Sequence, residues 1–281
     1  MNEYSRKMLK IPTYNLLREE DKDKQPVLDV RNLGIDFGGL TAVDSFNITI
    51  GPTEISGLIG PNGAGKTTIF NLLTGVYQPT RGSVLINGID IKGMPTHKVN
   101  KLGIARTFQN IRLFTDMTAL DNVKVGMHNS IKCAFPSSLL HLPGYYKAEK
   151  EANKRAMELL EFMDLADVVD QKAGSLPYGV QRRLEIVRAL ATNPSIILLD
   201  EPAAGMKPSE TTERMHQIRR IRDTFHIAIF LIEHDMNLVM NVCEAIAVVN
   251  YGRIIAKGTP EEVRSNPAVI EAYLGREEAD A

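Results

Sequence analysis

The sequence predicts an α/β fold in which helices cover a mostly parallel β-sheet and a helical lobe is inserted into the chain. Three observations support this prediction. Short apolar runs recur with helical patterns between the later ones, a glycine-rich loop joins one run to a helix, and the strand signal disappears between Met117 and Asn193. Alternation of strands and helices is typical of parallel sheets, because parallel neighbours need long crossover connections.

The elements follow in order from these patterns. Short apolar runs predict strands at residues 27–30, 46–50, 55–59, 84–86, 196–199, 228–232 and 245–249. Helical periodicity predicts helices at 67–73, 208–225 and 235–242 outside the lobe, and at 119–127, 148–163 and 179–192 within it. The inserted lobe is identified as the stretch in which helices are predicted and strands are not.

The chain length of 281 residues is enough for a large core, and we expect one domain with an attached lobe rather than two independent domains. Residues 1–26 carry a mixed charge run with little periodicity, which favours a flexible arm. The expected organisation is an arm at 1–26, a domain at 27–275 with its helical lobe at about 117–193, and a tail at 276–281.

Charge balance, apolar stretches and cysteine content limit the kinds of partner and the cellular compartment to expect. Lys plus Arg (33) nearly balances Asp plus Glu (34), so the net charge of −1 favours no nucleic-acid partner. The longest apolar stretch, residues 227–232, is too short to cross a membrane, and the N-terminal MNEYSRKMLK lacks an apolar signal core. We therefore expect a cytosolic chain whose two cysteines, Cys133 and Cys243, are reduced and structural.

A phosphate-binding loop is the most specific motif. Residues 60–68 read GPNGAGKTT, which fits the pattern G-x-x-x-x-G-K-[ST] between an apolar run and a helical run. Its glycines leave backbone N–H groups open toward phosphates at a helix N-terminus. The expected contact set is Gly60, Pro61, Asn62, Gly63, Ala64, Gly65, Lys66, Thr67 and Thr68.

Three side chains of this loop have distinct expected roles. Lys66 reaches the β- and γ-phosphates, Thr67 ligates Mg²⁺, and Thr68 contacts an α-phosphate oxygen. The loop predicts a nucleotide-binding P-loop protein, but by itself it does not separate ATPases from GTPases or kinases.

A pair of carboxylates follows another predicted strand. In SIILLDEP, residues 195–202, an apolar run precedes Asp200 and Glu201. Because ligands of open parallel sheets bind at the carboxyl ends of the strands, this pair is expected beside the phosphate loop. Asp200 can hold Mg²⁺, and Glu201 can act on a nucleophilic water. A DE pair at a strand end is also a common solvated turn, so the prediction depends on the loop.

Six motifs together resemble the ATP-binding cassette ATPases. In order they are GPNGAGKTT, Gln109 in RTFQN, LPYGVQRRLEIVRAL, LLDEP, AAGM and His234 in LIEHD. The resemblance covers residues 27–275, and FGGLTAVDSFN, ARTFQNIRLF, EPAAGM and YGRIIAKGTPEEVRSNPAVIEAYLG are most similar to the ATP-binding subunits of branched-chain amino acid importers. It implies a P-loop NTPase with a mostly parallel core sheet, an antiparallel β subdomain and an inserted helical lobe.

The resemblance also implies roles that the patterns alone leave open. Phe37 is expected to stack on adenine, although an aromatic there is also consistent with the core. Gln109 is expected to approach Mg²⁺ and the attacking water, and His234 to hold the γ-phosphate. The implied catalytic residues are Glu201, His234, Lys66 and Gln109, and the implied metal ligands are Thr67, Gln109 and Asp200.

A signature segment, residues 176–180, is implied to act across a dimer on the γ-phosphate bound by the other subunit. The family pattern LSGGQ becomes Leu176, Pro177, Tyr178, Gly179 and Val180. Val180 replaces the usual glutamine, so a polar contact is lost unless Gln181 supplies it. Residues 203–206 are implied to link the two sites.

The resemblance implies the ATP-hydrolysing subunit of a membrane importer, with ATP and Mg²⁺ as cofactors. The implied partners are a second, non-identical ATPase, transmembrane permease subunits and, indirectly, an extracytoplasmic substrate-binding protein. The chain would lie on the cytoplasmic face of the membrane as a peripheral subunit. Leu113 and Phe114, which follow Gln109, are candidate permease contacts, unless they belong to the core of the lobe.

Two alternatives remain open. The first keeps the fold and changes the task, to a urea or lipid transport system or to a soluble cassette ATPase. Repair proteins of that kind carry a long coiled-coil insertion and translation factors carry two cassettes, and this chain has neither. The second is a P-loop small-molecule kinase, which would need neither LPYGVQRRLE nor His234.

Overall fold

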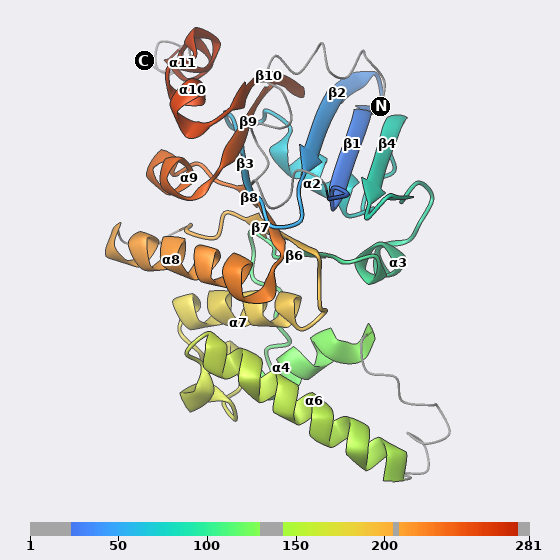
Figure 1. The fold of residues 1–281 in the computed structure, drawn as a ribbon, viewed down its shortest axis with the longest axis vertical. Coiled ribbons are helices and arrows are strands. Elements are labelled where there is room, and N and C mark those ends of the chain that lie inside the picture. Colours follow the sequence, from blue (N-terminus) through green and yellow to red (C-terminus); the bar gives the residue numbers. More distant parts are fainter. Residues whose placement is uncertain (1–23, 130–142, 205–207, 275–281) are drawn as a thin grey trace. The chain divides into compact units, whose positions relative to one another are not determined.

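The computed structural model describes residues 24–129, 143–204 and 208–274 (Figure 1). The chain divides into two compact units. Unit 1 comprises Met1–Ile104 and Ser195–Ala281, and unit 2 is Ala105–Pro194. Residues 1–23 of the predicted arm, the predicted tail at 276–281, Cys133 and residues 205–207 lie outside the described residues. The predicted link at 203–206 is therefore described only at Ala203 and Ala204.

The core sheet of unit 1 is mostly parallel. Its strand order is β10-β9-β3-β8-β7-β6, in which β3, β7, β8 and β9 run parallel and β10 pairs antiparallel with β9. Its strands are β3 (Ile55–Ile59), β7 (Ile196–Asp200), β8 (Ala228–Ile232), β9 (Ala245–Asn250), β10 (Arg253–Gly258) and, at the boundary between the two units, β6 (Ile104–Arg106). Every residue of β3, β7 and β8 is buried, as expected for parallel strands covered on both faces. The predicted core sheet is confirmed.

A second sheet of unit 1 is antiparallel, with the order β2-β1-β4-β5. Its strands are β1 (Leu28–Phe37), β2 (Leu40–Ile50), β4 (Arg81–Ile86) and β5 (Ile89–Asp90). The rings of Phe70 and Phe230 pack 5.3 Å apart in a hydrophobic cluster that also includes Phe46 of β2. The antiparallel β subdomain is confirmed, and it shares one core with the parallel sheet.

Two helices of unit 1, α9 (Met236–Val242) and α10 (Pro260–Arg264), begin at residues whose side chains cap them. The Asp235 carboxylate accepts hydrogen bonds from the backbone N–H groups of Asn237 and Leu238, and Thr259 forms a capping box with Glu262. The other helices described in unit 1 are α2 (Lys66–Leu73), α3 (Thr96–Lys101), α8 (Pro208–Phe225) and α11 (Pro267–Leu274). The helix predicted at 235–242 begins one residue later, because Asp235 is its N-cap.

Unit 2 is helical, and the predicted helical lobe is confirmed. Its helices are α4 (Ala119–Gly126), α6 (Pro143–Phe162) and α7 (Tyr178–Leu190), with short 3₁₀ helices at Met127–Asn129, Ala166–Val168 and Ala173–Ser175. A methyl group on Gly126 would lie 2.5 Å from the Arg188 carbonyl oxygen, so α4 approaches α7 more closely than any side chain permits. The three helices contact one another, and each contributes a fully buried side chain, Val123 of α4, Leu160 of α6 and Leu184 of α7.

Two expectations from composition can be compared with the described residues. Cys243 is a buried free thiol whose pKa is raised by burial, which makes it an inert core residue. No helix within 24–129, 143–204 or 208–274 has both the length and the apolar character that crossing a membrane requires.

Candidate nucleotide-binding site

Three segments that carry predicted site residues meet at one edge of the core sheet. β3 lies beside β8, which lies beside β7, and all three are parallel. The carboxyl end of β3 leads into the phosphate loop, that of β7 into the turn at Glu201, and that of β8 into the turn at His234. This is the edge at which open parallel sheets bind their ligands.

The phosphate loop is shaped by glycines that no other residue could replace without movement. A methyl group on Gly60 would lie 2.1 Å from the Val249 carbonyl oxygen. Gly65 has a φ of 101° as the N-cap of α2, and a methyl group there would lie 2.9 Å from the Ala42 carbonyl oxygen. The backbone N–H of Gly252 donates to the Ala64 carbonyl over 2.9 Å. Strand β2 and the β9–β10 turn therefore hold one side of the loop.

The other side of the loop can accept an anion. Lys66, Thr67 and Thr68 form the first turn of α2, whose N-terminus attracts negative charge. The Lys66 Nζ atom donates to the carbonyl oxygens of Gly60 (2.6 Å) and Pro61 (3.0 Å). Thr67 is exposed, and a methyl group on Gly63 would contact nothing within 4 Å. The exposed Thr67 hydroxyl and the helix N-terminus, together with an ammonium that lies at the loop backbone, form a set of groups that fits a polyphosphate.

The carboxylates at this edge differ in exposure. Asp200 ends β7 and is buried, whereas the Glu201 side chain is 21% exposed. Glu201 has a φ of 49°, an unusual conformation for a non-glycine residue that occurs preferentially at functional sites. Its backbone N–H donates to the Ile232 carbonyl over 2.9 Å, which fixes it to the end of β8.

His234 lies next to Glu201. The His234 Nδ1 atom is 3.9 Å from the Glu201 Oε1 atom, and the His234 side chain is 63% exposed. This distance exceeds that of a direct hydrogen bond, so a small movement or a bridging group would join the two side chains. The turns that carry Glu201 and His234 are joined by a buried carboxylate.

That buried carboxylate, Glu233, was missed by sequence reasoning. Its Oε1 atom accepts a hydrogen bond from the Ala203 backbone N–H (2.8 Å), and its Oε2 atom accepts one from the His234 N–H (3.1 Å). Burial raises the pKa of Glu233. Glu233 therefore ties the turn after β7 to the turn after β8, and so supports both Glu201 and His234. A charged residue directly after a fully apolar strand was the available signal.

Phe37, at the end of β1, is half-exposed and pairs with an aromatic that was not predicted. Its ring lies 5.4 Å from the Tyr77 ring at 75°, an edge-to-face arrangement. The exposed part of Phe37 is consistent with stacking rather than a core position.

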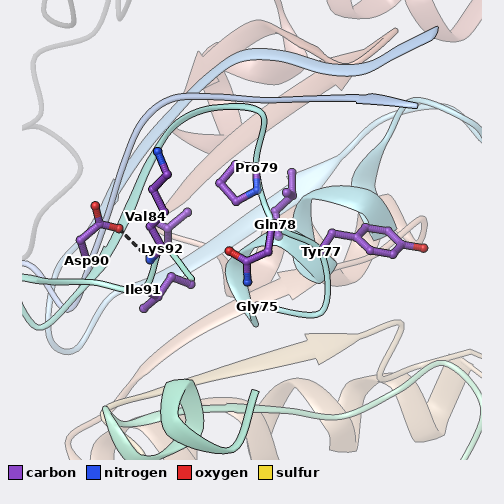
Figure 2. Close-up of a pocket in the computed structure, with 9 residues that line it drawn as sticks. Gly75, Tyr77, Gln78, Pro79, Val84, Asp90, Ile91 and Lys92 are labelled. Atoms are coloured by element: carbon purple, nitrogen blue, oxygen red, sulfur yellow. Dashed lines mark hydrogen bonds between the residues drawn. The ribbon is translucent and has the colours of Figure 1, made fainter. Parts of the chain in front are cut away.

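A pocket beside Tyr77 does not extend the site (Figure 2). It is a shallow hollow without internal space for a water molecule, whereas ligand pockets typically hold roughly 300–1,000 Å³. The lining residues are Leu72, Gly75, Tyr77, Gln78, Pro79, Val84, Asp90, Ile91 and Lys92. Figure 2 shows the Tyr77 ring extending away from Asp90 and Lys92.

The remaining predicted site residues belong to unit 2. The signature segment forms the start of α7, with Pro177 as N-cap, and both Tyr178 and Gly179 are exposed. The Gln181 side chain donates from Nε2 to the Leu176 carbonyl oxygen over 2.7 Å. The Gln181 amide nitrogen is thus engaged by the backbone of the signature segment. Gln109 lies between β6 and α4 in the same unit.

The chain matches two family models. The model described as ABC transporter matches residues 43–204, and the model described as Branched-chain amino acid ATP-binding cassette transporter matches residues 253–279. The high-affinity branched-chain amino acid transport ATP-binding protein BraF of Pseudomonas aeruginosa is 46% identical over 89% of this chain and 98% of its own length. The protein of the same description in Escherichia coli, LivG, is 48% identical over the same shares.

Solved structures are similar over most of the chain. The ADP conformation of an ATP-binding cassette of an ABC transporter is 32% identical with a TM-score of 0.77, covering 90% of this chain and 100% of that one. A dimeric post-hydrolysis cassette bound to ADP and Pi is 25% identical with a TM-score of 0.70, covering 83% of this chain and 98% of that one.

Proposed function

This chain is a member of the ABC transporter family, and from that premise we propose that it is the ATP-hydrolysing subunit of a membrane importer for branched-chain amino acids. The observation that carries the ATPase function is the meeting of the phosphate loop, the Asp200–Glu201 pair and His234 at the carboxyl edge of β3, β7 and β8. The C-terminal family match and the printed descriptions of the relatives support the substrate class.

The loop and its neighbours are suited to bind MgATP. The N–H groups at the start of α2 and the Lys66 ammonium would hold the β- and γ-phosphates, and Phe37 would stack on adenine. Mg²⁺ would neutralise phosphate charge and is held in such sites by one or two protein oxygens together with phosphates and water. Thr67 and Asp200 supply oxygens of this kind, and Gln109 would add an amide oxygen.

Hydrolysis needs a base and a group that stabilises charge on the γ-phosphate. Glu201 would accept a proton from the attacking water, while His234 and Lys66 would stabilise the transferring phosphoryl group. The 3.9 Å separation of Glu201 and His234 supports shared action on one water and one phosphate. Glu233 would keep both turns in place, since its carboxylate bonds to each of them.

Two cassettes would close on two nucleotides. The dimeric cassette structure with ADP and Pi supports a second ATPase subunit, and the open N-terminus of α7 is suited to face that subunit's γ-phosphate. We propose that the partner is non-identical, that both subunits bind transmembrane permease subunits at the cytoplasmic face of the membrane, and that an extracytoplasmic binding protein delivers the substrate. Phe114, which is 48% exposed, and Leu113 would contact the permease.

Replacing the proposed base tests the ATPase function. Glu201→Gln should retain ATP binding and lower hydrolysis by at least ~10²-fold, the scale of losing a general base. Glu271→Gln, which neutralises an exposed carboxylate on α11, is the matched control and should hydrolyse ATP at the wild-type rate. Equal turnover in the Glu201 variant and the wild type would contradict the assignment.

Uptake by cells tests the substrate class. Deleting the gene should abolish high-affinity uptake of radiolabelled leucine, isoleucine or valine, and the wild-type gene, but not the Glu201→Gln variant, should restore it. Urea uptake serves as the comparison, because a urea importer is the competing assignment. Unchanged branched-chain amino acid uptake together with lost urea uptake would refute the proposed substrate class and leave the ATPase function intact.

A further inference from the structure

The segment that carries Gln109 depends on side chains for its shape. Residues 107–118, between β6 and α4, form neither helix nor strand. The fully buried Asn122 of α4 accepts a hydrogen bond from the Phe114 N–H (2.9 Å) and donates to the carbonyl oxygens of Phe114 (3.0 Å) and Thr118 (2.9 Å). Asn122 thus fixes the later part of the segment, and α7 fixes the part around Gln109.

Two buried charged residues of α7 hold the backbone around Gln109. The Arg182 guanidinium donates to the carbonyl oxygen of Phe108 (2.5 Å) and to that of Gln109. The Glu185 Oε1 atom accepts from the N–H groups of Phe108 (3.3 Å) and Arg112 (3.4 Å). The two side chains form an ion pair with 3.3 Å between Arg182 NH1 and Glu185 Oε2, and both are at most 4% exposed.

This arrangement is costly unless every group is paired, since buried charges are stable only with full hydrogen bonding. Arg182 satisfies its planar donors with carbonyl oxygens that point in fixed directions, so it defines the path of the backbone at Gln109. A change in the position of the Arg182 guanidinium should therefore shift the backbone at Gln109.

Tyr178 connects the Arg182–Glu185 pair to the signature segment. Tyr178 is the first residue of α7 and lies one turn before Arg182 on the same face. The Tyr178 hydroxyl oxygen accepts a hydrogen bond from Arg182 Nε (3.0 Å), and the Arg182 Cζ atom lies 5.4 Å from the centre of the Tyr178 ring. Tyr178 as a whole is 52% exposed, at the segment that would face a second subunit.

We propose that the Tyr178 hydroxyl is a positioning group for Gln109, acting through Arg182, and that it links the signature segment to the nucleotide bound by the same chain. This inference rests on the proposed function, in which Gln109 approaches the chain's own nucleotide and Tyr178 faces the partner's. A displacement of the signature segment on closure of the dimer pulls on Arg182 and moves the Gln109 backbone with it. The two nucleotide sites of the dimer are coupled by this route.

The isolated full-length chain separates positioning from direct contact. At concentrations where sedimentation shows a monomer, no partner nucleotide faces Tyr178, so any effect of its hydroxyl on the chain's own nucleotide passes through the chain. The measurement is the affinity for a non-hydrolysable ATP analogue and for ADP, each with Mg²⁺, by titration calorimetry. The variants are Tyr178→Phe, Gln109→Ala and the double variant. Tyr146→Phe on α6, which removes the hydroxyl of another exposed tyrosine of unit 2, is the matched control.

Tyr178→Phe should weaken binding of the ATP analogue by up to about tenfold, as for one lost hydrogen bond, and leave ADP binding unchanged, because Gln109 acts near the γ-phosphate. In the Gln109→Ala background the same change should have no further effect. Equal weakening of both nucleotides, additive losses in the double variant, or behaviour like that of Tyr146→Phe would each overturn the inference. A wild-type chain that binds neither nucleotide would overturn the proposed function itself.

Discussion

Replacing Glu54 with glutamine should change the pH dependence of folding in a direction and size that the structure specifies. Glu54 directly precedes β3 and is 1% exposed. Its Oε2 atom accepts from the Gly51 N–H (3.0 Å) and its Oε1 atom accepts from the Ser56 hydroxyl. A glutamine can keep both contacts, because its amide nitrogen can donate to the Ser56 oxygen. The variant therefore removes the charge and leaves the packing in place.

Burial raises the pKa of Glu54 from 4.5 to about 7, although the ammonium of Lys257 favours the ionised form. A group whose pKa is higher in the folded state stabilises the fold fully below its unfolded pKa, and this contribution is lost as the pH rises through the folded pKa. Each pKa unit corresponds to about 1.4 kcal/mol. Between pH 5 and pH 8 the wild-type free energy of unfolding should therefore fall by about 2–3 kcal/mol more than that of Glu54→Gln.

Urea unfolding at pH 5, 6, 7 and 8 measures this difference. The stability gained by Glu54→Gln relative to wild type should increase steadily with pH. Glu271→Gln, an exposed carboxylate on α11, should run parallel to wild type over the same range. If the unfolding free energies of Glu54→Gln and wild type instead change in parallel with pH, the pKa of Glu54 is the same in the folded and unfolded states. The reasoning from burial is then refuted.

Three further predictions concern the nucleotide site and its partners. Lys66→Ala should weaken ATP binding by roughly 1.5–3 kcal/mol, because it removes a charge-assisted contact, and unchanged affinity in a fluorescent-ATP titration would contradict the assignment of the loop. Val180→Gln should raise the ATPase rate of the assembled transporter by about threefold to tenfold through one added hydrogen bond, since Gln181 already bonds to Leu176. ATPase assays in which the phosphate-loop lysine of either subunit is removed should assign the faster hydrolysis to the site that contains the partner's loop. If Val180→Gln is neutral or harmful in both of these backgrounds, the prediction is refuted. Replacing Leu113 and Phe114 with Asp should release the chain from permease-containing membranes. The variant should stay folded, because Asn122 holds the Phe114 backbone rather than its side chain. If the variant still co-purifies with the transporter, the docking face lies elsewhere.

The predictions succeeded for segments whose pattern is local and unambiguous. The strands at 55–59 and 228–232 match β3 and β8 in both bounds, and the strand at 196–199 ends one residue short of β7. These strands are buried on both faces, so continuous apolar runs identify them. The phosphate loop was equally clear, because its conformation requires glycines at stated positions and a helix directly afterwards.

The predictions fell short where a strand has one exposed face. The strand expected at 27–30 extends to Phe37 as β1, and β2 begins at Leu40 rather than at 46. Both strands mix buried and exposed positions, and their pairing shifts register at several points, so neither has the continuous apolar run that the prediction relied on. β10 was missed for the same reason, because only Ala256 and Gly258 are buried among its residues.

The sequence by itself determined the fold class, the phosphate loop and the identity of the residues at the carboxyl edge of the sheet, because glycine spacing and apolar runs act through local backbone geometry. Only the tertiary structure decided the roles of Glu233, Arg182, Glu185 and Asn122, each of which a sequence pattern would place at the surface. Their hydrogen bonds join backbone groups that are distant in sequence, such as the 30-residue separation between Ala203 and Glu233. A buried polar side chain is stable only when its partners surround it, and those partners come together only when the chain has folded.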